Sequence, residues 1–340
     1  MKPRSRLFRF IKWVLLGFGA LVLVLGAFVG WLYVTRFSGP DAMDFNAYHP
    51  FRSEQARADF LAMEREAAKA WPVAGEERTV KTSFGTTFMR VSGPADAPPL
   101  VLLPGGGSTS LIWKANVAGL STAHRVYALD QIYDFGQSIY TREIRTGADF
   151  AAWLDELFDV LQLGPSVRVG GYSYGGFVAT QYALAHPERT ARLVLLAPAG
   201  TVQPIPVPAI ARMARSLLPV RGQVSSVMYW VWDDLARSGP AGKALVEERI
   251  DFVLQATGAF KFKPGVNPYV LSDQELASLK VPVLFLVGEH EKIYDDPRAA
   301  VARVNRVNPG IKTELIAGTG HDLMFTHTEQ VNALVLEFLK

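Results

Sequence analysis

The sequence predicts an α/β fold: a mostly parallel sheet with helices on both faces, a helical cap insertion, and one N-terminal transmembrane helix before it. Three observations support this expectation. Short apolar and β-branched runs alternate with helical segments over residues 78–340, which is typical of a parallel sheet covered on both faces. Residues 200–280 interrupt the alternation without a clear strand. The first 36 residues combine basic side chains with a long uncharged apolar run.

The N-terminal segment predicts a membrane anchor. No charged residue occurs from Trp13 through Val34, and a helix of this length crosses about 30 Å of hydrocarbon. A cleavable signal peptide is the alternative, but its apolar run is usually shorter, and no small-residue cleavage site follows Val34. Basic residues without any acid favour a cytoplasmic N-terminus and place the remaining chain on the extracytoplasmic face; they are Lys2, Arg4, Arg6, Arg9, Lys12 and Arg36.

Composition excludes several classes of protein. The formal net charge is +3, but the basic N-terminal segment exceeds this value, so the remaining chain is net negative and gives no sign of a nucleic-acid partner. The chain has no cysteine, which excludes disulfides, thiolate zinc sites and a cysteine nucleophile. No histidine pair has the spacing of a zinc-binding helix. We therefore expect neither a metal nor an organic cofactor.

The expected elements follow one another in a simple order. Residues 1–36 form the basic tip and anchor, and residues 37–77 form a linker with a helix over 53–70 that Ser53 could cap. The α/β core comprises residues 78–199 and 281–340, and the cap comprises residues 200–280. A hairpin at 78–83 and 86–91 opens the sheet. Further strands are expected at 100–103, 125–129, 167–169, 192–196, 283–287 and 312–316, and helices at 110–120, 148–161, 177–185, 297–307 and 330–339.

The cap is rich in aromatic residues, which have two interpretations. They could wall an apolar pocket, or they could attach the cap to the body. The residues concerned are the segment 228–232 together with Phe252, Phe260, Phe262 and Tyr269.

A serine framed by glycines follows the predicted strand at 167–169. The segment Gly171-Tyr172-Ser173-Tyr174-Gly175 predicts a sharp strand-to-helix turn, because glycines two residues before and after the serine leave room for close backbone. Such a turn presents the Ser173 hydroxyl at a helix N-terminus, where free N–H groups and the helix dipole favour negative charge on an attacked carbonyl oxygen. A glycine-rich turn before an ordinary helix is the alternative.

This turn resembles the nucleophile elbow of the α/β-hydrolase fold family, and the resemblance covers about residues 78–340. A second matching segment is Pro104-Gly105-Gly106-Gly107, directly after the strand at 100–103. In the family, an N–H of this loop and the N–H after the nucleophile form the oxyanion hole, which implies Gly106 and Tyr174 as donors. The sequence departs from the family in having Pro104 where histidine is common.

The resemblance also implies the acid and the base of a catalytic triad. The family keeps its acid three residues after the glycine that ends a late strand, which is Glu291 here, with Asp295 as the second candidate. Its base follows a glycine-rich turn after the last strand, which is His321. Of the other histidines, only His290 lies directly after a core strand, and there it would displace Glu291.

These residues predict a serine hydrolase. His321 would accept the Ser173 proton, and Glu291 would orient the imidazole. We expect a carboxylic-ester hydrolase that forms an acyl-enzyme from a small-molecule ester with an apolar acyl group. The same triad also serves carbon–carbon bond hydrolases, lactonases, thioesterases and lyases. A catalytically silent, membrane-tethered binding protein is a further alternative.

Overall fold

The computed structural model of the chain describes residues 12, 13, 19, 23, 26, 27, 50–261 and 265–340. One compact unit consists of Phe45–Phe260 and Pro264–Lys340. A second unit, Met1–Asp44 with Lys261–Lys263, lies almost wholly outside the described residues, as does most of the expected anchor. Among the helices of the described residues, none combines the length and the apolar character that a bilayer crossing requires.

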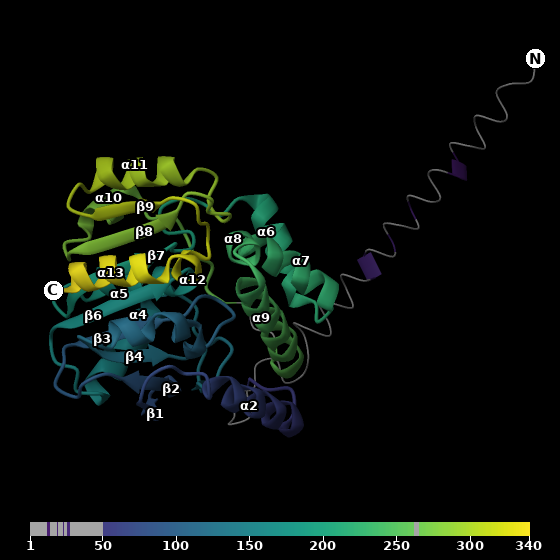
Figure 1. Cartoon of the computed structure of the whole chain (residues 1–340), viewed down its shortest axis with the longest axis horizontal. Coiled ribbons are helices and arrows are strands. Elements are labelled where there is room, and N and C mark those ends of the chain that lie inside the picture. The colour runs from purple at the N-terminus through teal and green to yellow at the C-terminus, as the bar shows by residue number, and fades with distance from the viewer. Residues whose placement is uncertain (1–11, 14–18, 20–22, 24–25, 28–49, 262–264) are drawn as a thin grey trace, which may run out of the picture. The chain divides into compact units, whose positions relative to one another are not determined.

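The first unit is built on one sheet, which has nine strands in the described part of the chain (Figure 1). The strand order is β1-β2-β4-β3-β6-β7-β8-β9, with the short β5 beside β2. Pairing is antiparallel at β1, β2 and β5 and parallel from β4 to β9. The bounds are β1 Gly75–Thr82, β2 Gly85–Ser92, β3 Pro99–Leu103, β4 Arg125–Leu129, β5 Ile139–Tyr140, β6 Val167–Tyr172, β7 Thr190–Leu196, β8 Val283–Gly288 and β9 Lys312–Ile316. The predicted α/β class with a mostly parallel sheet is confirmed.

The parallel strands are apolar on both faces because both faces are covered. In β8, Val283, Phe285 and Val287 belong to one core cluster, whereas Leu284 and Leu286 belong to another. Successive strand residues point to opposite faces, so an uninterrupted apolar run is what a doubly covered strand requires.

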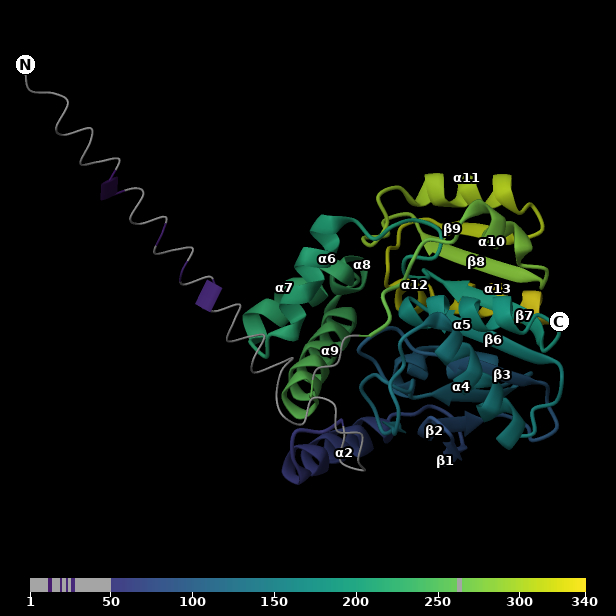
Figure 2. The ribbon, with the colours of Figure 1, turned by 180° about the vertical axis from the view of Figure 1, so that it is seen from behind.

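Helices cover the two faces of the sheet (Figures 1 and 2). Residues of α4, α5, α10 and α11 belong to the first cluster, and residues of η1, α3 and α13 belong to the second. The predicted helix at 110–120 is divided into a 3₁₀ turn and a short α-helix. The bounds are η1 Ser110–Ala115, α3 Val117–Leu120, α4 Gly147–Val160, α5 Tyr174–Ala185, α10 Asp273–Ser278, α11 Pro297–Val307, α12 Leu323–Thr326 and α13 Thr328–Leu339.

A group of helices lies between β7 and β8 in the chain and beside the body in space (Figure 1). Their bounds are α6 Val207–Met213, η2 Ala214–Leu217, α7 Arg221–Val231, α8 Asp233–Arg237 and α9 Pro240–Ala259. We call this group, α6 to α9, the cap helices. The aromatic residues Trp232 and Phe260 are almost fully buried and contact rings outside the cap, at Phe325 and Phe51. For these two residues the attachment interpretation holds.

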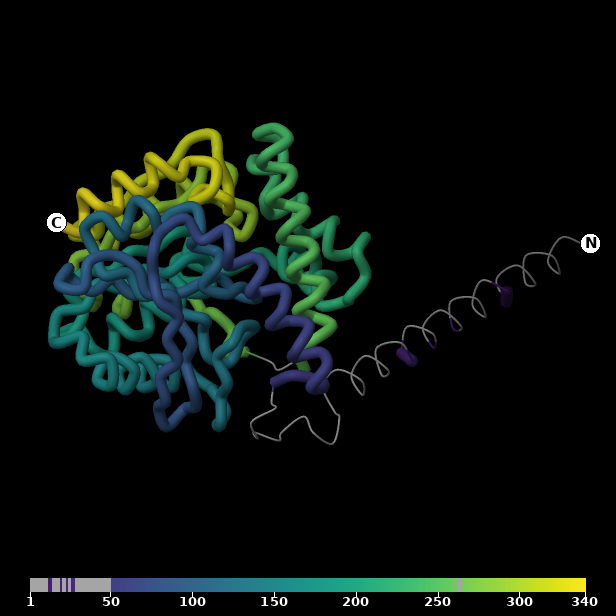
Figure 3. The backbone as a smooth tube through the Cα atoms, turned by 60° about the horizontal axis from the view of Figure 1, so that its bottom comes forward, coloured from purple at the N-terminus to yellow at the C-terminus, as the bar shows by residue number. Residues whose placement is uncertain are grey.

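Helix α2, Glu54–Ala68, packs against the C-terminal end of α9, which it meets at an angle (Figure 3). Ser53 caps it as expected, accepting from the Ala56 N–H at 3.1 Å. Phe60 is fully buried and packs edge-on against Phe260 with 4.9 Å between ring centroids. The helix also buries the Glu64 carboxylate, which no pattern in the sequence predicted. Helix α2 is therefore part of the folded body.

Candidate active site

The elbow serine has strained backbone geometry. Ser173 lies between β6 and α5 with φ 51° and ψ −117°, a conformation that costs a non-glycine residue about 1–3 kcal/mol. Its flanking glycines are required for steric reasons. A Cβ on Gly171 would lie 2.2 Å from the Gly175 carbonyl oxygen. A Cβ on Gly175 would lie 2.4 Å from the carbonyl oxygens of Leu103 and Pro104. The helix begins at Tyr174, three residues before its expected start, because the turn leads directly into it.

Three side chains from distant parts of the sequence meet at the carboxyl edge of the sheet. His321, in the loop after β9, has its Nε2 at 3.0 Å from the Ser173 Oγ. Its Nδ1 lies 3.0 Å from each carboxylate oxygen of Glu291, in the loop after β8. A carboxylate at Nδ1 favours the tautomer with its proton there, which leaves Nε2 free to accept the serine proton.

Glu291 is the carboxylate that His321 contacts. Its side chain is fully buried, and Oε1 also accepts the Ile293 N–H at 3.0 Å. Asp295, the second candidate, is exposed, and in the described part of the chain it has no hydrogen bond to His321. His290 points elsewhere, with Nδ1 at 3.2 Å from each Asp234 carboxylate oxygen. The geometry therefore favours Glu291 as the acid and His321 as the base.

Tyr172, the last residue of β6, holds the histidine loop, the loop after β9 that carries His321. The Tyr172 hydroxyl donates to the His321 carbonyl at 2.9 Å, and the Tyr172 ring lies 5.0 Å from the imidazole between ring centroids. Burial raises the pKa of Tyr172, so its hydroxyl stays protonated. Trp232, from the cap helices, lies next to the same hydroxyl, with Nε1 at 3.4 Å.

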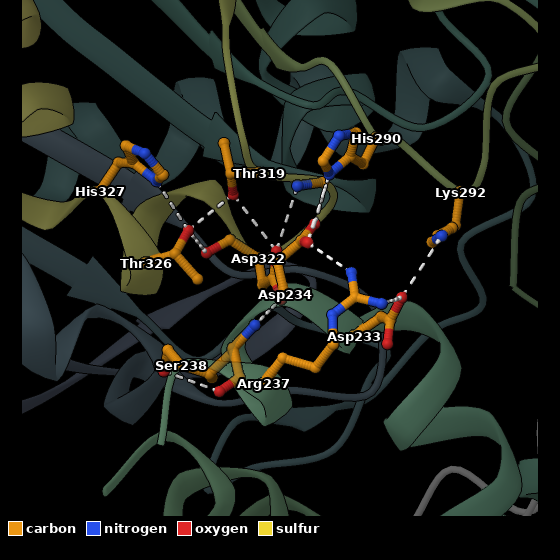
Figure 4. Close-up of polar contacts among 12 residues, drawn as sticks. Asp233, Asp234, Arg237, Ser238, His290, Lys292, Thr319, Asp322, Thr326 and His327 are labelled. Carbon is orange, nitrogen blue, oxygen red and sulfur yellow. Dashed lines mark hydrogen bonds and ion pairs between the residues drawn. The ribbon is translucent and has the colours of Figure 1, made fainter.

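Cap helix α8 adds a polar network on the other side of this loop (Figure 4). Asp322, directly after His321, is fully buried and accepts the Leu235 N–H at 2.6 Å and the Gly320 N–H at 3.3 Å. Burial raises the pKa of Asp322. A second link joins Lys292, beside Glu291, to Asp233 at 3.6 Å. The sequence did not single out Asp322, although its position beside His321 was a usable signal.

The expected oxyanion donors lie side by side. A Cβ on Gly106 would lie 3.4 Å from the Tyr174 Cβ, and Tyr174 is the first residue of α5, where an N–H has no intrahelical acceptor. Within the described residues, neither the Gly106 N–H nor the Tyr174 N–H has a hydrogen-bond acceptor. Both donors are therefore available to a bound oxygen.

Buried ionisable residues support the oxyanion loop, which we define as residues 104–110, and sequence reasoning missed all of them. Thr109 donates to Glu64 at 3.1 Å, and the Ser110 N–H donates to Asp130 at 2.7 Å. Both carboxylates lie near the Arg90 guanidinium, and desolvation raises their pKa values, to about 8 for Glu64. Two further side chains, Asp134 and Arg249, bind Gly107. No spacing motif connects these positions.

In the described part of the chain, no group of three or more histidine, aspartate and glutamate side chains is arranged to hold a metal ion. The expectation that the site works without a metal or cofactor stays a prediction.

The comparisons with known proteins agree with this architecture. Residues 98–328 match the family described as the alpha/beta hydrolase fold. Carboxylesterase YbfK of Bacillus subtilis is 35% identical over 291 residues, covering 85% of this chain and 96% of that protein. An uncharacterized carboxylesterase, nap, from the same organism is 36% identical over 275 residues, covering 80% of this chain and 89% of that protein.

Solved structures give the same result. The naproxen esterase of Bacillus subtilis has a TM-score of 0.77 at 31% identity and covers 85% of this chain and all of its own. The crystal structure of carboxylesterase CesB (YbfK) has a TM-score of 0.75 at 33% identity, with 84% and 98% coverage. The chain therefore belongs to the α/β-hydrolase family. Its relatives bear out the expected class of carboxylic-ester hydrolase.

Proposed function

We propose that the protein is a carboxylesterase in which Ser173 is the nucleophile, His321 the base and Glu291 the acid. As the Ser173 Oγ bonds to the ester carbonyl carbon, its proton moves to His321 Nε2, and the carbonyl electrons move onto oxygen. Gly106 and Tyr174 donate their N–H groups to this oxyanion. Glu291 stabilises the imidazolium that forms.

The second half of the reaction uses the same groups. The tetrahedral intermediate collapses, the alcohol leaves with the proton from His321, and the acyl group stays on Ser173. Water then gives a proton to His321 and attacks the acyl carbon. The serine takes that proton back as the carboxylic acid leaves, so atoms and charges balance.

The hydrogen-bonded chain Ser173–His321–Glu291 carries this proposal. Both links are 3.0 Å long, within the distance over which a proton transfers directly. The loops that carry His321 and Glu291 are bonded to the cap helices and to the sheet. The three side chains are therefore in position before a substrate binds. With Glu291 at Nδ1, the other ring nitrogen, Nε2, faces the Ser173 hydroxyl.

A direct test uses the full-length chain with Ser173→Ala. We expect the wild type to hydrolyse p-nitrophenyl esters and to react with a fluorophosphonate probe, and the variant to lose at least about 10⁴-fold in kcat and all labelling. A panel of acyl lengths from acetate to palmitate should show a preference for apolar acyl groups. Ester turnover in Ser173→Ala equal to that of the wild type would overturn the mechanism.

We also propose that the catalytic unit is held at a membrane by residues 13–34, with a cytoplasmic N-terminus. The support is the uncharged run and the basic residues before it. On this view residues 200–280 form the cap of the extracytoplasmic enzyme. A reporter fused after Lys340 tests the orientation: a reporter active only in the cytoplasm contradicts it.

A further inference from the structure

Gly107 is bound by side chains on both of its backbone polar groups. Its N–H donates to the Asp134 carboxylate, at 2.9 Å from Oδ2 and 3.2 Å from Oδ1. Its carbonyl accepts from the Arg249 Nη2 at 2.8 Å. Gly107 has φ +66°, the left-handed conformation that glycine adopts without steric penalty. The residue directly before it is Gly106, the proposed oxyanion donor.

The two side chains come from different layers of the molecule. Asp134 follows β4 in the core, and its Oδ1 also accepts the Phe135 N–H at 2.7 Å. Arg249 comes from cap helix α9, and its guanidinium lies 5.0 Å from the centre of the Phe252 ring. Gly107 therefore connects the core with the cap.

Both side chains are charged near neutral pH. Desolvation lowers the pKa of Arg249 to about 10 and raises the pKa of Asp134 to about 6. Hydrogen bonds with one ionised partner are stronger than neutral ones. The two contacts are therefore well suited to hold a glycine-rich loop in one conformation.

The oxyanion loop needs such support because its own residues restrict its backbone conformation very little. Three consecutive glycines, Gly105 to Gly107, have more backbone freedom than any other tripeptide. Only the φ and ψ of Gly106 separate its N–H from the N–H of Gly107. Fixing the peptide groups on both sides of Gly107 consequently limits the directions in which the Gly106 N–H points.

We propose that Asp134 and Arg249 are positioning residues that hold the Gly106 N–H toward the oxyanion, and that Arg249 makes this orientation depend on helix α9. The inference deepens the proposed function and rests on it. Neither side chain needs to touch the substrate. Oxyanion stabilisation is complete only while α9 lies on the oxyanion loop.

The chain offers a matched control in Arg212 of helix α6. Its guanidinium also lies 5.0 Å from an aromatic ring centre, at Trp230, and its Nη2 donates to a carbonyl, that of Ser226, at 3.2 Å. These contacts stay within the cap helices. Arg249→Met and Arg212→Met thus remove the same chemistry at two places, of which only one reaches the oxyanion loop.

The test measures kcat, KM and inhibition by a trifluoromethyl ketone in full-length variants. We expect Arg249→Met to lower kcat about 10- to 100-fold, a fraction of the loss for a removed oxyanion donor. KM should stay within about threefold, and ketone affinity should fall in parallel with kcat, because the ketone adduct is an oxyanion. Arg212→Met should leave all three near wild-type values, and Arg249→Lys should recover part of the loss.

Asp134→Ala approaches the same glycine from the core, through a carboxylate whose charge also interacts with Arg249. It should also lower kcat and ketone affinity together, and the double variant Asp134→Ala/Arg249→Met should lose less than the product of the single losses. A kcat within threefold of the wild type in both single variants would overturn the proposal. So would a rise in KM without a fall in kcat. The proposed function fails separately, through ester turnover in Ser173→Ala.

Discussion

The two sides of Ser173 are built in different ways. On one side, the proposed base and acid are the side chains of His321 and Glu291, and each occupies the loop after a core strand. On the other side, the proposed donors are backbone N–H groups. The side chains that hold the oxyanion loop take no part in the proposed reaction. A motif reveals the first side because the chemistry fixes residue type and position. The second side depends on support that many different residues could provide.

The largest effect is expected on the triad side. Glu291→Gln should lower kcat by about 10⁴, because an amide at His321 Nδ1 can favour the wrong tautomer. Asp295→Asn is the control, since Asp295 is exposed, and its kcat should equal that of the wild type. Steady-state ester hydrolysis measures both. A large loss in Asp295→Asn with none in Glu291→Gln would exchange the two roles.

Combining the two sides sharpens the comparison. Oxyanion stabilisation persists when a triad residue is removed, so Arg249→Met should lower the residual rate of Glu291→Gln by about the same 10- to 100-fold factor as in the wild type. Single-turnover assays at high enzyme concentration measure this rate. If Arg249→Met has no effect in the Glu291→Gln background, the two sides do not act independently.

A smaller effect is expected where the cap meets the histidine loop. Asp322→Ala leaves the buried N–H groups of Leu235 and Gly320 without their acceptor, which should lower the free energy of unfolding by about 2 kcal/mol. Urea titration of the full chain in detergent measures this loss. Asp234→Ala, which removes the more exposed contact with His290, should cost less than about 1 kcal/mol. Equal losses would show that burial does not distinguish the two contacts.

A further effect on stability concerns pH. Desolvation raises the pKa of Glu64 from 4.5 to about 8, so the folded state binds this proton more tightly than the unfolded state. Its stabilising contribution is full below pH 4.5 and declines as the pH rises toward 8, by about 1.4 kcal/mol per pH unit at most. Glu64→Gln should flatten this decline in unfolding experiments between pH 5.5 and 7.5. An unchanged dependence of stability on pH would mean that another group binds the proton, and Asp130 would be the first to test.

Much of the fold could be predicted from the sequence because its signals are local. Helix α11 spans the predicted Pro297–Val307, and the strand ends that carry Ser173 and His321 follow from apolar runs and glycine turns. The start of α5 was wrong by three residues, because elbow geometry rather than helix propensity determines it. The break between η1 and α3 likewise had no local signal.

The support of the oxyanion loop could not be predicted in this way. Thr109 and Glu64 are 45 residues apart, and Gly107 and Arg249 are 142 apart. Neither pair has a required spacing, since only tertiary packing brings its members together. A charged residue in a helix is usually exposed. The sequence therefore favoured an exposed Glu64, whereas the structure buries it.

The burial of helix α2 has a practical consequence for any shortened version of the enzyme. Phe51 pairs with Phe260 in an isolated bridge, and the Arg52 N–H donates to the Ala259 carbonyl at 2.8 Å, so the body extends well ahead of its first strand. A version that starts at the β1 hairpin would lack α2 and Phe51, which pack against the end of α9, the helix that carries Arg249. Designs that omit the apolar N-terminal run should therefore retain everything from Phe51 onward.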